Sequence, residues 1–254
     1  MEKLLKDKVI VISGGTKGIG RGIAIESAKQ GAKVVIGGRD EQSAKDIIQT
    51  IEEEKGEAIF VYTDLHRVDD CKKMFDTAVE QYGKIDGFVN YAGVTHKGTI
   101  VECEEKVFDD IFDINIKAAF FCVQNAIKYM KGRGGSIVVF GSTHDDKGEK
   151  DRAAYACSKA ALSVLVTHVA KHYSQDQIRI NYITAGWIPT EGELSLREKQ
   201  GMNEEELRKL AAKVIPMGRM QEIEDYLPAV MYLLSDYSPM VTGANLRIAG
   251  GLYF

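Results

Sequence analysis

The chain has 254 residues and a formal net charge of −4 at pH 7, with 44% hydrophobic and 28% charged residues. This composition excludes a disordered or fibrous chain, and the length suits a single α/β domain over residues 1–254. Acidic and basic residues are interspersed, which argues against a nucleic-acid-binding surface and against a polybasic membrane patch.

Neither the N-terminal segment nor the cysteines indicate export. Met1–Lys8 carries charges of both signs, and the apolar run Val9–Ile12 is too short for a signal-peptide core or a membrane span. The four cysteines form no CxxC pair, which is typical of free thiols in a reducing compartment. We therefore expect a cytoplasmic protein with no nucleic-acid or membrane partner.

The first predicted strand, Val9–Ile12, runs into a glycine-rich turn at Ser13–Gly20, and a helical pattern follows. Glycines in such a turn let backbone amides at a helix N-terminus approach a pyrophosphate, and the helix dipole favours the anion. The spacing here is G-x-x-x-G-x-G, and a purely structural turn is the alternative.

The second predicted strand, Lys33–Gly38, ends about twenty residues after the glycines, where a dinucleotide fold meets the adenosine ribose. An acidic residue there would select NAD. Gly38 is instead followed by Arg39, whose guanidinium suits a 2′-phosphate, and Lys17 in the glycine turn adds a second positive charge. NADP(H) is therefore predicted, with NAD(H) possible if both cations are solvated and Asp40 binds the ribose.

Helices and strands continue to alternate along the middle of the chain. Helices are predicted over Glu41–Lys55 and Val68–Tyr82, and strands over Ala58–Tyr62 and Ile85–Val89. The segment Asn90–Gly93 follows the second of these strands.

Two polar residues stand out in the next segments. Asn115 lies within the apolar face of a long helical segment, where most buried asparagines satisfy a backbone group. The predicted strand Ser136–Phe140 delivers Ser142 to its C-terminal end, the edge at which open parallel sheets bind ligands. Ser142 also suits a plain turn or helix N-cap.

A predicted helix from Ala153 to about Tyr173 carries Tyr155 and Lys159 four positions apart, hence on one face. A phenol has a pKa of ~10, and a cation beside it favours the phenolate and lowers that pKa. Tyr155 is therefore a candidate general acid and base. The alternative is a solvated helix face.

The last third of the chain contains a charged segment, Glu191–Lys213, that looks helical but lies outside the strand–helix alternation. We predict a substrate lid at about residues 190–215. Strands over Ile178–Ile183 and Asn245–Ile248 and a helix over Glu222–Leu234 complete the pattern. About seven strands alternating with helices predict an α/β fold with one doubly wound parallel sheet.

The order and spacing of these motifs resemble the short-chain dehydrogenase/reductase family over essentially the whole chain. The turn at Ser13–Gly20 resembles its TGxxxGIG motif, Asn90–Gly93 resembles NNAG, and Tyr155 and Lys159 match YxxxK. The resemblance implies an NAD(P)-dependent oxidoreductase with a Rossmann-type fold. The residues that fall at the family's catalytic tetrad are Asn115, Ser142, Tyr155 and Lys159.

The resemblance also implies a role for each residue. Tyr155 donates a proton to a carbonyl or removes one from an alcohol, and Ser142 hydrogen-bonds the substrate oxygen. Lys159 holds the nicotinamide ribose and lowers the pKa of Tyr155, while Asn115 keeps a water in the proton relay. The implied cofactor contacts are Gly14, Thr16, Lys17, Gly18, Ile19, Gly20, Arg39, Asp64, Leu65, Asn90, Ala92, Gly93, Tyr155, Lys159, Ile188 and Thr190.

Three residues depart from the family pattern. Tyr91 replaces the second asparagine of NNAG, Ala185 replaces a proline before Gly186, and Ala249 replaces the aspartate near the C-terminus. None of these is a reacting group, so we expect them to affect substrate choice and rate.

The residues that follow the strand ends are polar, which favours a polyhydroxylated substrate such as a sugar or polyol, because an apolar one would leave polar groups unpaired. The residues expected to face the substrate are Val94, Thr95, His96, Thr143, His144, Asp145, Trp187 and the lid from Glu191 onward.

Other functions remain open. A 3-oxoacyl-(acyl-carrier-protein) reductase needs a basic docking patch, for which Lys131, Arg133 and Arg179 are candidates. A steroid or bile-acid hydroxy dehydrogenase is a further enzyme alternative, and a dinucleotide-binding regulatory subunit is the alternative without catalysis. No metal site is expected, because His168 and His172 lack the glutamate of HExxH. The resemblance implies a homotetramer.

Overall fold

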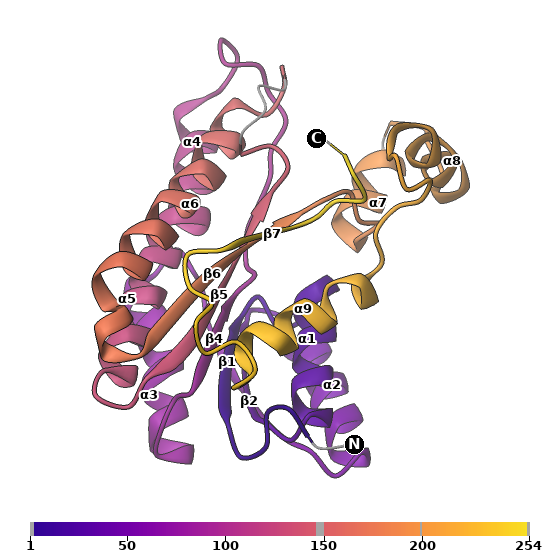
Figure 1. Ribbon diagram of the computed structural model, residues 1–254. Helices are drawn as coiled ribbons and strands as arrows, with labels where there is room; N and C mark the ends of the chain where they lie inside the picture. Colours follow the sequence, from indigo (N-terminus) through magenta and orange to yellow (C-terminus); the bar gives the residue numbers. More distant parts are fainter. Residues whose placement is uncertain (1–2, 146–149, 199, 253–254) are drawn as a thin grey trace.

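The structure is a computed structural model that describes residues 3–145, 150–198 and 200–252. Within these residues, seven parallel strands form one sheet in the order β3-β2-β1-β4-β5-β6-β7. Helices cover both faces, with α3, α4, α5 and α6 on one side and α1, α2 and α9 on the other (Figure 1). The predicted doubly wound α/β fold is confirmed.

The elements follow the predicted alternation, with small differences at their ends. The strands are β1 Val9–Ser13, β2 Lys33–Gly38, β3 Glu57–Tyr62, β4 Gly87–Asn90, β5 Gly135–Ser142, β6 Ile178–Ala185 and β7 Asn245–Ile248. The helices are α1 Gly18–Lys29, α2 Glu41–Glu53, α3 Val68–Tyr82, α4 Glu105–Phe112, α5 Ala119–Met130, α6 Ala153–Tyr173, α7 Glu191–Glu198, α8 Glu204–Val214 and α9 Leu227–Leu234.

Two apolar layers hold the helices on the sheet. Successive residues of a strand point to opposite faces, so Ile10 and Ile12 of β1 pack toward α1 and α9 while Val11 packs toward α3 and α5. Both faces of the strands are therefore buried, as the unbroken apolar runs in the sequence predict.

The chain order creates a crevice at the carboxyl edge of the sheet. From β1 the chain builds outward through β2 to β3, then returns to place β4 on the other side of β1. Ser13 and Asn90 are paired in register at the ends of these two strands. Helices diverge at such a reversal of strand order, and open α/β sheets bind their ligands there.

The predicted lid consists of two helices, α7 and α8, where the sequence suggests one charged helical segment. Asn203 begins α8 with a capping box, since its side chain accepts from the Glu206 amide at 3.0 Å and the Glu206 carboxylate accepts from the Asn203 amide at 3.0 Å. Lys199 of the predicted lid lies outside the described residues.

A third apolar cluster attaches α8 to the C-terminal segment. Ala249, which departs from the family pattern, is buried there against Leu207, Ile215 and Leu252. A carboxylate at position 249 would be buried among apolar side chains, at a large desolvation cost. The alanine therefore suits the packing of this lid.

The helix predicted over Glu222–Leu234 begins later than expected. Ile223–Asp225 forms a short 3₁₀ turn, and α9 starts at Leu227. Pro228 lies in the first turn of α9, where its missing N–H removes no helical hydrogen bond.

Among the described helices, the segment Ala153–Asp176, which contains α6, has the length and hydropathy that would suffice to cross a membrane. Its side chains Leu162, Val166 and Val169 are buried in the core between sheet and helices. Core packing therefore accounts for part of the apolar composition of this segment, while Val164 on the same helix is exposed.

We expect Gly141→Ala to destabilise the fold. A Cβ on Gly141 would lie 1.8 Å from Cζ and from the hydroxyl oxygen of Tyr182, a buried residue whose hydroxyl lies 2.8 Å from Asp145 Oδ2 and 3.0 Å from the Lys159 carbonyl. Overpacking of this kind costs about 1–3 kcal/mol in the free energy of unfolding. Thermal denaturation measures the melting temperature of Gly141→Ala, with Gly98→Ala as the control because a Cβ at position 98 would meet nothing within 4 Å. Equal melting temperatures of the two variants would contradict the packing described.

Candidate active site

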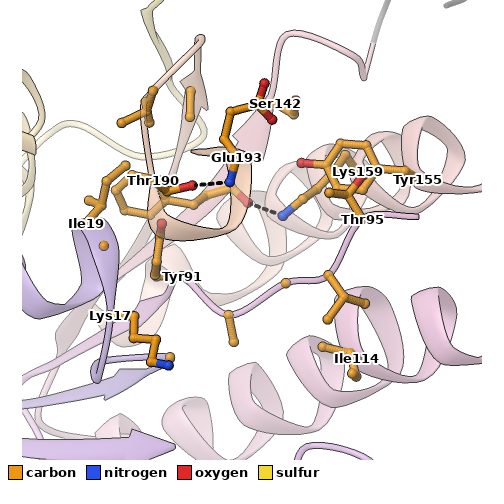
Figure 2. Close-up of a pocket in the computed structure, with 18 of the residues that line it drawn as sticks. Lys17, Ile19, Tyr91, Thr95, Ile114, Ser142, Tyr155, Lys159, Thr190 and Glu193 are labelled. Carbon is orange, nitrogen blue, oxygen red and sulfur yellow. Dashed lines mark hydrogen bonds between the residues drawn. The ribbon is translucent and has the colours of Figure 1, made fainter. Parts of the chain in front are cut away.

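The carboxyl edge of the sheet opens into a cleft of about 1000 Å³ (Figure 2). Its size suits a dinucleotide with a small second ligand. All the predicted site residues line it except Gly20, Asn90 and Asn115, which are buried against residues that do. The structure therefore brings together residues that the sequence spreads from position 14 to position 190.

The glycine turn approaches the neighbouring strand more closely than any side chain allows. Gly14 has a φ of +76°, and a Cβ there would lie 2.8 Å from the Ala92 backbone. Gly18, with a φ of +53°, begins α1, and the N-cap residue Lys17 makes no side-chain cap. Backbone amides of this first turn are therefore available to an anion, and the cradle fits the diphosphate of a dinucleotide.

Tyr91 packs against this turn from the end of β4. Its hydroxyl accepts a hydrogen bond from the Ile19 amide, and burial raises the pKa of Tyr91 to about 12. Its ring makes an edge-to-face contact with Phe140, with 5.3 Å between centroids. The residue that departs from NNAG thus supports the glycine turn and occupies one of its amides.

The end of the cleft at which the adenosine is expected carries the predicted cations. Lys17 Nζ lies 3.0 Å from an oxygen of Asp40, and Asp40 also caps α2 by accepting from the Ser43 amide at 3.0 Å. The Ser43 amide and then Lys17 lower the pKa of Asp40 to about 2. A recess beside the main cleft is lined by Thr16, Lys17, Arg39, Asp40 and Glu41.

An unpredicted charged network lies beside Asp64. His66 bridges two carboxylates, with Nδ1 2.9 Å from Asp64 Oδ1 and Nε2 2.8 Å from Asp110 Oδ1. His96 Nε2 lies 2.7 Å from the other oxygen of Asp110. The network joins the end of β3 to α4 and to the loop after β4. His96, expected to face the substrate, instead belongs to this network.

Ser142, Tyr155 and Lys159 meet at the centre of the cleft (Figure 2). Lys159 is buried and its Nζ donates to the Phe140 carbonyl at 3.1 Å. The same Nζ lies 5.8 Å from the centroid of the Tyr155 ring. Strand β5 therefore supplies both Ser142 and the oxygen that holds Lys159.

The pKa of Tyr155 differs in direction from the expectation. Burial raises it, and the opposing effects come first from a hydrogen bond with Ser142 and then from the charge of Arg152. Burial also lowers the pKa of Lys159 to about 8. Desolvation of both groups thus outweighs the effect expected from a cation beside a phenol.

Asn115 fixes the loop after β4. It lies in a π-helical segment, Asp113–Ala118, between α4 and α5. Its side chain accepts from the Val94 amide at 2.8 Å and donates to the Val94 carbonyl at 2.9 Å and to Ser158 Oγ at 3.0 Å. A Cβ on Gly93 would lie 3.2 Å from both Asn115 Oδ1 and Lys159 Nζ, so the glycine lets these two groups approach.

Asn90 is buried beneath the crevice. Its Oδ1 accepts from Ser13 Oγ at 3.1 Å, while its Nδ2 has no hydrogen-bond partner among the described residues. A buried donor without a partner is costly, and such groups concentrate at functional sites.

Helix α7 lines the side of the cleft that is expected to hold the substrate. Glu193 Oε1 accepts from Trp187 Nε1 at 2.8 Å and from Arg197 Nε at 2.7 Å, and the Arg197 guanidinium stacks over the indole at 5.1 Å. The predicted substrate-facing residues that line the cleft are Val94, Thr95, Thr143, His144 and Trp187. Asp145 instead accepts a hydrogen bond from the buried Tyr182 hydroxyl at 2.8 Å.

Sequence reasoning missed Arg152, which also lines the cleft. Its position just before the predicted helix that carries Tyr155 was the available signal. Glu193 and Arg197, which line the cleft too, belong to the lid segment from Glu191 onward that was expected to face the substrate.

Known proteins resemble this chain over nearly its whole length. A sequence model of the family described as enoyl-(acyl carrier protein) reductase matches residues 14–253. The L-rhamnose 1-dehydrogenase (NAD(P)(+)) of Azotobacter vinelandii is 34% identical over 256 residues, which cover 98% of each chain. The 3-oxoacyl-(acyl-carrier-protein) reductase of Thermotoga maritima is 31% identical over 249 residues, again 98% of each chain.

The fold comparison agrees with the sequence comparison. A crystal structure of a substituted actinorhodin polyketide ketoreductase with NADPH matches with a TM-score of 0.91 and 26% identity, covering 96% of this chain and 97% of that one.

The His66 network predicts a pH-dependent stability. Hydrogen bonds to Asp64 and then Asp110 raise the pKa of His66 above its ordinary 6.5. Its stabilising contribution is therefore complete below about pH 6.5 and is lost as the pH rises through the folded-state pKa. We expect His66→Gln to flatten the fall in melting temperature above pH 6.5, while His172→Gln, on the exposed face of α6, leaves it unchanged. If the melting temperature of His66→Gln still falls as steeply above pH 6.5, a group other than His66 causes the pH dependence.

Proposed function

The chain belongs to the short-chain dehydrogenase/reductase family of oxidoreductases, and we propose that it prefers NADP(H) and acts on a small polyhydroxylated substrate of the sugar or polyol type. It transfers a hydride between the cofactor and a carbonyl or secondary alcohol. The observation that carries the proposal is the convergence of Ser142, Tyr155 and Lys159 in the cleft that also holds the glycine turn.

The side chains suggest how the proton moves. Ser142 and Tyr155 hold the substrate oxygen, and Tyr155 gives a proton to a carbonyl or accepts one from an alcohol. Burial raises the pKa of Tyr155, which keeps the phenol protonated for carbonyl reduction. Lys159, fixed by the Phe140 carbonyl, and Asn115, fixed by Val94, hold the surrounding backbone in place. The nicotinamide supplies or accepts the hydride when bound.

The recess at Arg39 supports the preference for NADP(H). Asp40, the group that would bind a ribose hydroxyl, is already engaged by the α2 amide of Ser43 and by Lys17. Arg39 and Lys17 line the same recess, where two cations suit a 2′-phosphate. The similar polyketide ketoreductase structure was determined with NADPH, which is compatible with this assignment. NAD(H) is the alternative cofactor.

The polar lining supports a hydroxylated substrate. Thr95, Thr143 and His144 line the cleft near Tyr155, and Trp187 and Glu193 line it from the lid side. A site of this kind rejects ligands that leave its polar groups unpaired. The similarity to a dehydrogenase named for L-rhamnose supports a sugar substrate.

The second candidate is a 3-oxoacyl-(acyl-carrier-protein) reductase, which the similarity to the Thermotoga maritima enzyme favours. The basic patch that this enzyme needs for docking the acyl carrier protein has little support from the positions of its candidate residues. Lys131 and Arg133 precede β5, at the edge of the sheet opposite the cleft. The guanidinium of Arg179 is engaged by Ser238 Oγ at 2.9 Å and by the Ser235 carbonyl at 3.1 Å.

The remaining alternatives have less support. The polar side chains that line the cleft give no support to a steroid or bile-acid substrate, and the tetrad side chains argue against a regulatory subunit without catalysis. A cytoplasmic homotetramer stays part of the proposal. Exposed apolar side chains on α4, α5 and α6, namely Phe108, Phe120 and Val164, support association between copies of the chain.

Tyr155→Phe tests the reaction. We expect kcat/KM to fall by roughly 10²- to 10⁴-fold, the usual contribution of a general acid or base, in a panel of sugars, polyols, 3-oxoacyl thioesters and steroids. Tyr173→Phe, at the far end of the same helix, should keep full activity. If the protein binds NADPH but oxidises it with no carbonyl in the panel, or if Tyr155→Phe is unimpaired, the proposed chemistry is refuted.

Arg39→Ala tests the cofactor preference. We expect kcat/KM for NADPH to fall by roughly 10- to 100-fold, the range for losing a hydrogen bond to a charged group, with little change for NADH. Lys45→Ala, which removes an exposed cation from α2, is the control. Equal use of NADPH and NADH by the unaltered protein would refute the assignment of Arg39 and Lys17.

A further inference from the structure

Arg152 is a buried cation whose charge is incompletely paired. Its side chain is 9% exposed, and it lines the cleft at the start of α6. The nearest carboxylate oxygen, from Asp151, lies 4.0 Å from Nε, beyond hydrogen-bond length, and the Asp151 side chain is 42% exposed. Buried charges in proteins are normally paired and hydrogen-bonded, so this guanidinium needs a further partner.

The described residues leave donors of Arg152 unused. Its Nη1 donates to Thr95 Oγ1 at 2.9 Å, a neutral acceptor. Asp151 is shared with Lys97, whose Nζ lies 3.5 Å away. Among the described residues, no other carboxylate oxygen lies within 4.0 Å of the guanidinium. A guanidinium carries five N–H donors in a planar fork that matches a carboxylate.

The position of Arg152 is fixed and close to the reacting groups. Its backbone pairs with Gly98, and its carbonyl accepts the Ala156 amide at 2.8 Å. Arg152 is the N-cap residue of α6 and precedes Tyr155, in the first turn of that helix, by three residues. Thr95, the partner of Arg152, lies on the same side of the cleft as Tyr155 and Lys159 (Figure 2).

We propose that Arg152 binds a carboxylate of the substrate, so that the substrate is a hydroxy or oxo acid, such as a sugar acid, rather than a neutral sugar. This inference rests on the proposed function and narrows its substrate class. The guanidinium holds the carboxylate while Ser142 and Tyr155 hold the oxygen at the reacting carbon. The acid end of the substrate thereby sets which carbon meets the cofactor.

The charges around the cleft favour a single negative charge over a phosphate dianion. The second arginine of the cleft, Arg197, is already paired with Glu193 at 2.7 Å. Lys159 is buried and donates to a backbone carbonyl. The carboxylates of Glu193 and Asp145, which raise the pKa of Tyr155, would repel a dianion more strongly than a monoanion. The single guanidinium of Arg152, incompletely paired among the described residues, therefore suits a carboxylate better than a phosphate dianion.

The test compares acids with their neutral counterparts. The probes are threonate, xylonate and gluconate against threitol, xylitol and glucitol, each with NADP⁺. Arg152→Gln removes the charge but keeps an N–H donor for Thr95. We expect its kcat/KM for the acids to fall by roughly 10- to 100-fold more than its kcat/KM for the alditols, mainly through KM, because an effect on Tyr155 is common to both classes of substrate. Arg152→Lys should recover part of the loss, because it restores the charge without the fork.

Two controls separate binding from other effects. Arg133→Gln makes the same charge change outside the cleft and should leave the preference for acids intact. If Arg152 acts solely on the ionisation of Tyr155, Arg152→Gln will shift the pH profiles of acids and alditols alike, and that result would overturn the inference. Equal use of acids and alditols by the unaltered protein would do the same.

Binding without turnover distinguishes this inference from the proposed function. Calorimetry measures the binding of the same acids to Tyr155→Phe and to Tyr155→Phe with Arg152→Gln, both saturated with NADPH. Binding that depends on Arg152, without turnover by the unaltered protein, supports the inference and refutes the proposed function. Turnover of alditols without any binding of acids refutes the inference alone. If the acids do not bind and the protein turns over neither acids nor alditols, both the inference and the proposed function are refuted.

Discussion

The contact on which the site depends is the hydrogen bond from the Lys159 ammonium to the Phe140 carbonyl at 3.1 Å. It ties α6 to the end of β5, and so sets the distance between the helix that carries Tyr155 and the strand that carries Ser142. An ammonium buried in this way costs free energy unless it is held by polar groups. Gly93 makes room for it, since a side chain there would approach within 3.2 Å of Nζ, and Asn115 holds the same loop in place.

Burial dominates the electrostatics of the cleft. It raises the pKa of Tyr155 and lowers the pKa of Lys159 to about 8, so the low-dielectric surroundings weaken the charged form of both groups. Arg152 opposes this effect on Tyr155, and the nearest carboxylate oxygen among the described residues, that of Asp151, lies 4.0 Å from its Nε. A substrate carboxylate at Arg152 would therefore complete the pairing of the cleft and adjust the ionisation of the general acid in the same step.

The residues that depart from the family pattern are each accommodated by packing. Tyr91 replaces an asparagine, and its hydroxyl binds the Ile19 amide beneath the glycine turn. Ala249 lies in the apolar cluster that attaches α8 to the C-terminal segment. Ala185 continues β6, where its carbonyl accepts the Thr143 amide at 3.0 Å. The glycine turn and the predicted lid thus contain side chains that depart from the family pattern, around candidate catalytic residues that match it.

The sequence by itself determined the alternation of strands and helices, the parallel sheet and most of the candidate site, because apolar periodicity and short motifs such as YxxxK are local patterns. It could not separate α7 from α8, since both read as one charged segment. Only the tertiary structure decided that His96 pairs with Asp110, that Asp40 is engaged by Lys17 and α2, and that Arg152 is buried beside Tyr155 with unused donors. The physical reason is that charge pairing, desolvation and the direction of pKa shifts depend on neighbours distant in the chain, which local spacing does not specify.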